Sequence, residues 1–92
     1  MLIAGSKSWL NYRHQADVFH AYQLLRRNNF PDDRITLIAY DDIADNAQNP
    51  FQGQVFNYNG GPNVYPGANA IDVSGDNVTP SAFLNVRFYI LA

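Results

Sequence analysis

Apolar residues divide the first part of the chain into a strand, a helix and a second strand. Residues 2–4 form an apolar run that Gly5-Ser6 ends, which is typical of a strand buried on both faces of a parallel sheet. A helical period follows from His14 to about Asn28. Residues 34–40 are nearly all apolar, both at the odd and at the even positions, as in a strand whose two faces are buried. The order strand, helix, strand predicts a right-handed βαβ unit.

The predicted helix has one apolar face and a recognisable end. Val18, Ala21, Tyr22 and Leu25 fall at positions i, i+3, i+4 and i+7, so we expect them to face the sheet. Asn29 follows the last turn and favours the left-handed conformation that ends many helices.

Residues 44–79 have a different character. Asn, Gly and Pro recur every few residues, and between them lie two short β-prone pieces, Gln54–Asn57 and Asn63–Tyr65. This pattern predicts a long insertion that carries a hairpin, not a separate domain. Insertions of this length in a compact domain are often functional loops.

A second helix is predicted to start at Thr79 as N-cap with Pro80 at the first helical position. Its inward stripe would be Ala82, Phe83, Val86 and Ile90. Residues 87–92 are apolar nearly all round, and a helix of that kind needs partners on all sides. We therefore expect self-association through this apolar C-terminal helix and the exposed edge of a two-stranded sheet.

Composition narrows the function classes. The 92 residues suffice for one small domain, for which we expect a thin margin of stability. A net charge of −2 argues against a nucleic-acid partner. No apolar run reaches the roughly 20 residues of a membrane span, and residues 1–5 do not resemble a signal peptide. The absence of Cys excludes thiolate metal sites and a cysteine nucleophile within these residues.

General sequence patterns of catalytic and metal-binding sites do not indicate such a site in this chain. Asp41-Asp42 ends the second strand at the sheet edge where Gly5-Ser6 ends the first, and we expect a turn in which Asp42 caps the next segment. His14 and His20 lack the spacing of a metal-binding helix, so neither a metal nor a cofactor is expected. Asn77 heads a glycosylation sequon, although an N-cap role for its threonine is sufficient to explain it. Trp9-Leu10 are expected to cover the core.

One run of residues is more specific. Asn11-Tyr12-Arg13-His14-Gln15-Ala16-Asp17 follows Ile3-Ala4-Gly5-Ser6 and precedes His20-Ala21-Tyr22-Gln23. With these residues the chain resembles the N-terminal portion of the catalytic domain of the legumain (asparaginyl endopeptidase) family, peptidase family C13. The resemblance continues, in order and spacing, through Pro31-Asp32, Tyr40 to Ala44, Asn49-Pro50, Val64-Tyr65, Gly75-Asp76 and Val78-Thr79-Pro80 to Phe83-Leu84.

The resemblance implies a fold and a set of roles. Residues 1–92 would form part of a C13 peptidase domain: a caspase-like α/β/α sandwich, represented by the βαβ unit, the hairpin-bearing insertion and the second helix. The family cleaves peptides after asparagine with a cysteine nucleophile and a histidine. Asn11 matches the residue that orients that histidine, Arg13 and His14 match residues of the pocket for the substrate asparagine, and Phe19 is expected in the core.

The chain also departs from the family. The catalytic His and Cys of the family lie on later strands, and residues 87–92 no longer match its pattern, so we expect a truncated chain that is inactive alone. Alternatives are a non-catalytic binding or oligomerisation module, or a relative of the GPI-anchor transamidase, which shares Asn-Tyr-Arg-His. The family resemblance implies peptide or protein substrates and a lysosomal or vacuolar location.

Overall fold

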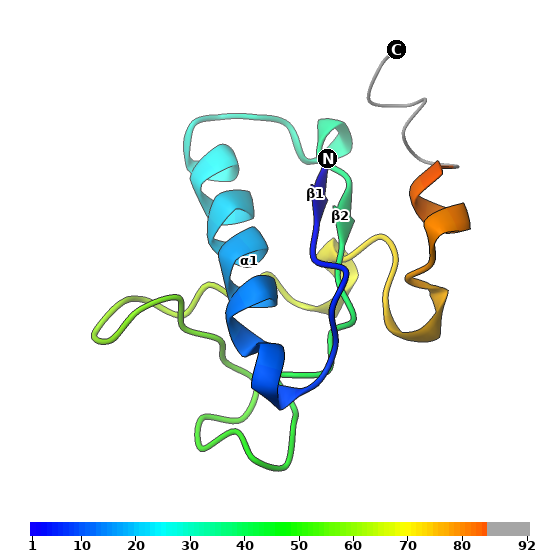
Figure 1. Ribbon diagram of the computed structural model, residues 1–92. Helices are drawn as coiled ribbons and strands as arrows, with labels where there is room; N and C mark the ends of the chain where they lie inside the picture. Colours follow the sequence, from blue (N-terminus) through cyan, green and yellow to red (C-terminus); the bar gives the residue numbers. More distant parts are fainter. Residues whose placement is uncertain (85–92) are drawn as a thin grey trace.

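A computed structural model describes residues 1–84 and contains the predicted βαβ unit (Figure 1). Strand β1 (Leu2–Ile3) pairs in parallel with β2 (Leu37–Ile38), and helix α1 (Tyr12–Arg27) connects them. Both strands are shorter than predicted. The second strand was expected to begin at Arg34, but Arg34 is the last residue of a 3-10 turn (Asp32–Arg34). On the side of β2 away from β1, Ile38 forms an isolated parallel bridge with Val73.

The end of α1 is as predicted. Asn29 has a φ of 67°, and its amide donates to the carbonyl of Arg26 over 3.1 Å. The amide of Phe30 donates to the carbonyl of Leu25 over 3.0 Å. These two bonds are those of a Schellman motif, which satisfies carbonyls that the helix leaves unpaired.

The buried face of α1 overlaps the predicted one. Tyr22 is buried as expected, and Val18 and Leu25 are partly covered and pack against the core. Ala21 is also only partly covered. The remaining buried positions of the helix are Gln15, Ala16 and Phe19. Phe19 and Gln15 are both fully buried, and the polar Gln15 can be buried because its side chain has hydrogen-bond partners. Phe19 itself has no exposed surface, which confirms its predicted place in the core.

The insertion at residues 44–79 is irregular, and its hairpin is reduced to one antiparallel bridge between Phe56 and Asn63. Hydrogen bonds made by asparagine side chains replace backbone hydrogen bonds that a regular hairpin would have. The Oδ1 atom of Asn63 accepts from the amides of Val55 (2.9 Å) and Tyr65 (3.0 Å). The buried Asn49 donates from Nδ2 to three main-chain carbonyls, those of Ile43, Ala44 and Gln54, each over 3.0 Å. Asparagine side chains thus satisfy a backbone that a regular sheet would otherwise pair.

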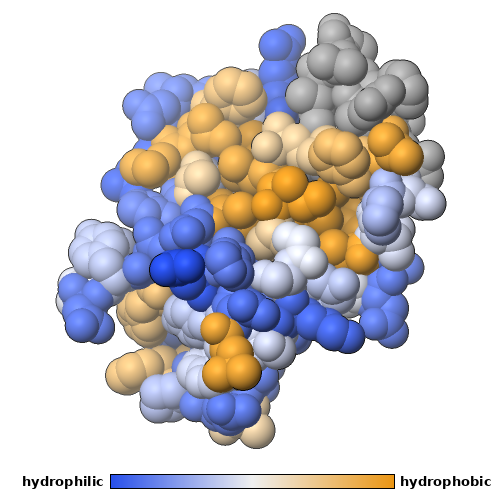
Figure 2. All heavy atoms as spheres, viewed as in Figure 1, coloured by the Kyte–Doolittle hydropathy of each residue, from blue (hydrophilic) through white to orange (hydrophobic). Residues whose placement is uncertain are grey.

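Residues 80–84 are helical, as predicted, and lie on the other side of the strands from α1 (Figure 1). Thr79 is the N-cap: its Oγ1 atom accepts from the amide of Ala82 over 3.1 Å. The predicted inward positions Val86 and Ile90, and the apolar run 87–92, lie outside the described residues. Apolar atoms gather over the strands on the face shown in Figure 2, and Ile3 of β1 is 39% exposed. No helix within residues 1–84 is long and apolar enough to cross a membrane.

Candidate functional site

Both strands end at the same edge of the sheet, as predicted, and α1 begins there (Figure 1). Asn11 occupies the N-cap position of α1 but makes no capping bond. Its Nδ2 atom instead donates to the carbonyl of Lys7 over 3.0 Å, which fixes the amide group against the preceding loop. The Oδ1 atom of Asn11 accepts no hydrogen bond from residues 1–84, so an acceptor remains at the carboxyl end of β1.

Arg13 and His14 are exposed on the first turn of α1. His14 lines a shallow hollow of about 470 Å³ with Asp17, Val18 and the end of β1, residues 3–6. Arg13 is not among the residues that line it. Within the hollow, the Oγ atom of Ser6 is buried and has no hydrogen-bond partner in the described part of the chain. The structure therefore brings His14, but not Arg13, together with an unmet polar group at the edge of the sheet.

Gln15 joins the two loops of this edge. The side chain is completely buried. Its Nε2 atom donates to Oδ1 of Asp42 over 2.7 Å, and its Oε1 atom accepts from the amide of Asp41 over 2.9 Å. Sequence reasoning assigned no role to Gln15; a polar residue inside an otherwise apolar helix face is the signal that could have indicated one.

Asp41 and Asp42 follow β2, and the side chain of Asp42 binds a segment that lies earlier in the chain. The Oδ2 atom of Asp42 accepts from the amide of Ser8 over 2.6 Å, so its carboxylate holds the loop that leads to Asn11. The prediction that Asp42 caps the next segment is therefore wrong for its side chain. The reason is that the loop after β1 offers an unpaired amide at the same edge of the sheet, together with the amide of Gln15.

Asp41 adopts a left-handed conformation with a φ of 60° and accepts from the hydroxyl of Tyr65 over 2.7 Å. Burial raises the pKa of Asp41 above its usual value; Asp45 and Asp42 add to this, whereas the bond from Tyr65 lowers the pKa. Burial and the neighbouring Asp41 carboxylate raise the pKa of Tyr65. The pair is thus a neutral hydroxyl donating to a carboxyl whose charge is disfavoured.

A second concave feature, called here the aromatic pocket, lies where the insertion meets the start of α1. It has a volume of about 770 Å³ and is lined by Trp9, Tyr12, Asn49, Pro50, Phe51, Phe56 and residues 57–61. Trp9 packs against the core as expected, but Leu10 is 94% exposed and does not cover the core. Leu10 belongs to a 3-10 turn that contributes no buried residue.

Among residues 1–84 no cluster of three His, Asp or Glu side chains could hold a metal ion. The start of α1 offers hydrogen-bonding groups. These are the amide oxygen of Asn11 at the N-cap position and the guanidinium of Arg13 and imidazole of His14, both exposed on the first turn. Groups of this kind can donate hydrogen bonds to a polar ligand or accept them from it.

A parallel βαβ unit with a polar motif at the carboxyl end of its first strand is an α/β architecture that places ligands at this edge. The Peptidase C13 family matches residues 1–88, and the chain belongs to this family. Its architecture is consistent with the N-terminal part of a caspase-like C13 domain.

Several longer proteins are similar to this chain. Legumain of Rattus norvegicus is 50% identical over 86 residues, which cover 94% of this chain and 20% of that protein. Legumain of Canavalia ensiformis is 50% identical over 80 residues, 87% of this chain and 17% of that protein. The vacuolar-processing enzyme of Citrus sinensis is 46% identical over 86 residues, which cover 94% of this chain and 17% of that protein. The chain thus spans no more than about a fifth of the length of these relatives.

Proposed function

We propose that this chain contributes the asparagine-recognition segment of a legumain-like cysteine endopeptidase that cleaves peptides after asparagine. The observation that carries the proposal is the match to the Peptidase C13 family over residues 1–88. It is supported by the position of Asn11, Arg13 and His14 at the N-cap and on the first turn of α1. In this proposal the Oδ1 atom of Asn11 accepts from the ring N–H of a catalytic histidine outside these residues. The carbonyl of Lys7 supports that role, because it accepts from the Nδ2 atom of Asn11 and so holds the side-chain amide in place.

Arg13 and His14 recognise the substrate asparagine in this proposal. A guanidinium offers several fixed N–H donors to one amide oxygen, which an ammonium group cannot do. The unmet hydroxyl of Ser6 beside His14 supports the view that a further polar group binds in this hollow.

We also propose that the 92 residues alone do not cleave peptides, because they contain no cysteine. On its own the chain would act as a non-catalytic module that binds peptides containing asparagine. Binding should be tested with two peptides that differ only in Asn or Asp at the central position. We expect tighter binding of the Asn peptide, lost in Arg13→Ala and reduced in Arg13→Lys.

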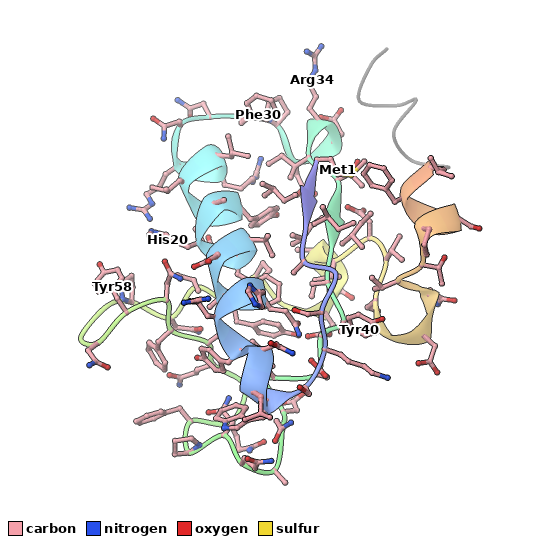
Figure 3. All side chains as sticks on the ribbon, in the orientation of Figure 1. Met1, His20, Phe30, Arg34, Tyr40 and Tyr58 are labelled. Carbon is pink, nitrogen blue, oxygen red and sulfur yellow. The ribbon has the colours of Figure 1, made fainter. Side chains whose placement is uncertain are left out.

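Arg34→Ala is the matched control. Arg34 is exposed in the turn before β2 (Figure 3), whereas Arg13 lies on the first turn of α1. Equal binding of the two peptides, or equal losses in Arg13→Ala and Arg34→Ala, would overturn the recognition role. Hydrolysis after asparagine by the purified chain would overturn the proposed inactivity.

Two further parts of the proposal concern partners and location. Self-association would use the edge of β1, whose Ile3 is partly exposed; a sedimentation series that stays monomeric at all concentrations would exclude it. A lysosomal or vacuolar location is supported by the name of the vacuolar-processing enzyme among the relatives. Organelle fractionation with an antibody to residues 1–84 would test that location.

A further inference from the structure

We infer that the aromatic pocket binds an uncharged aromatic side chain of the peptide, a few residues away from the asparagine. The inference rests on the proposed function, since it assigns a second contact to the same peptide. It concerns Trp9, Tyr12, Phe51, Phe56 and Tyr58, none of which has a role in the recognition of asparagine proposed above.

Two pairs of rings form walls of the pocket. Trp9 and Tyr12 meet edge to face with their centroids 5.1 Å apart, and Phe51 and Phe56 meet edge to face at 5.5 Å. The hydroxyl of Tyr12 accepts from the amide of Phe56 over 2.6 Å, so the start of α1 and the insertion are tied together. The walls are therefore held in place before a ligand binds, which lowers the entropy lost on binding.

The rim is apolar and open to solvent. Phe51 is 59% exposed and Tyr58 is 57% exposed, so apolar ring surface remains in water until something covers it. Tyr58 begins a tight turn in which Gly60 has a φ of 77° and the amide of Gly61 donates to the carbonyl of Tyr58 over 3.1 Å. The Tyr58 ring lies against the bare backbone of Gly61, where an added Cβ would come within 2.8 Å of the ring.

The chemistry of the lining selects an uncharged ligand. The sequence carries 6 basic and 8 acidic residues, yet none of them lines the pocket. A charged group would lose its hydration there without gaining a partner of opposite charge. The volume of about 770 Å³ lies within the usual range for ligand pockets, and the Asn57 and Asn59 amides can bind peptide groups.

Position connects the pocket to the peptide. Trp9 and Tyr12 lie on either side of Asn11 in the chain, and Tyr12 directly precedes Arg13 and His14. An extended peptide advances about 3.3–3.6 Å per residue. A peptide whose asparagine contacts the first turn of α1 can therefore reach the aromatic pocket with a residue a few positions away.

Trp9 provides the test, because it is the single tryptophan of the chain and lies in the pocket wall. Its fluorescence should be titrated with a series of peptides that keep a central Asn and place one Phe at each of the four positions on either side. The reference peptide carries Ser at all those positions. We expect one or two placements of Phe to tighten Kd about tenfold and to change the Trp9 emission. Asp at the same placement should bind no better than Ser.

Variants locate the effect. Phe51→Ser and Tyr58→Ser change exposed rings, and each should abolish the gain from Phe while leaving the far-ultraviolet circular dichroism of the chain unchanged. Leu10→Ser is the matched control: Leu10 is exposed and adjacent to Trp9 in sequence but does not line the pocket, so the gain should persist.

The outcomes separate this inference from the proposed function. If no placement of Phe improves binding while Asn is still preferred over Asp, the aromatic pocket is not a peptide site and asparagine recognition stands. If Phe improves binding and Arg13→Ala has no effect, the pocket stands and the recognition role of Arg13 falls. A gain from Phe that survives both Phe51→Ser and Tyr58→Ser places the contact elsewhere and overturns the inference.

Discussion

The Nε2 atom of Gln15 donates to Oδ1 of Asp42 over 2.7 Å, and this bond links the helix that carries Arg13 and His14 to the loop after β2. The other carboxylate oxygen of Asp42 accepts from the amide of Ser8, in the loop after β1. One buried side chain and one carboxylate therefore connect all three segments that meet at the candidate site. Loops at a functional edge need this kind of support to hold their side chains in place.

Gln15→Ala should lower the free energy of unfolding by about 1–3 kcal/mol, because it leaves the amide of Asp41 and an oxygen of Asp42 without their buried partner. Urea unfolding followed by circular dichroism measures the change. Gln48→Ala is the control, since Gln48 is exposed, and it should change the unfolding free energy by less than about 0.5 kcal/mol. Equal effects of the two substitutions would contradict the role given to Gln15.

Asp41 should make stability depend on pH. Its pKa in the folded chain is raised, chiefly by burial, so its charged form destabilises the fold at neutral pH. As pH falls through the folded pKa toward the ordinary value of 3.8, the folded chain takes up the proton first, and this destabilisation is relieved. Asp41→Asn should therefore be more stable than the parent chain at pH 7, with a difference that shrinks toward pH 4. Asparagine also tolerates the positive φ at this position.

Tyr65→Phe should move this pH dependence upward. The hydroxyl of Tyr65 lowers the pKa of Asp41, so removing it leaves burial less opposed. The ring can keep its edge-to-face contact with Phe19, whose centroid is 5.6 Å away. Unfolding free energies measured between pH 4 and pH 8 should show the transition of Tyr65→Phe at a higher pH than that of the parent. A shift to lower pH would show that the hydroxyl does not stabilise the charged carboxylate.

Substitutions of Asn29 should show that the end of α1 requires a residue that tolerates the left-handed backbone conformation. With φ at 67°, Asn29→Gly should keep or slightly raise stability, whereas Asn29→Ala should cost about 1 kcal/mol. Thermal unfolding of both variants measures the difference. Similar melting temperatures for Gly and Ala at this position would mean that the Schellman bonds do not depend on it.

Thr79→Ala should loosen the start of the second helix by about 1 kcal/mol, because the amide of Ala82 loses its acceptor. Hydrogen exchange at the amides of residues 82–84 reports this local change. Thr79→Ser keeps the hydroxyl and should retain most of the protection. Ser81→Ala, an exposed change within the same turn, should leave the exchange rates unaltered.

The buried face of α1 shows where sequence reasoning reached its limit. A helical stripe chosen by apolar character correctly included Tyr22, which is buried, and Val18 and Leu25, which pack against the core. It did not include the polar Gln15, which is buried on the same helix. Burial of that amide is acceptable only because Asp41 and Asp42, from a distant loop, satisfy it. No pattern within the helix contains that information. The motif Asn11 to His14 was recognisable, but its hydrogen bonds to the loop were not.

The sequence by itself determined the strand, helix, strand order, the left-handed end of α1 at Asn29 and the capped start at Thr79. These features depend on residues a few positions apart, so local pattern and backbone preference suffice. Only the tertiary structure decided that Gln15 binds the acidic pair, across 26 and 27 positions, and that Tyr12 holds Phe56 across 44 positions. Such contacts form when the chain packs, because the need to satisfy buried polar groups and cover apolar rings acts between segments that sequence order keeps apart.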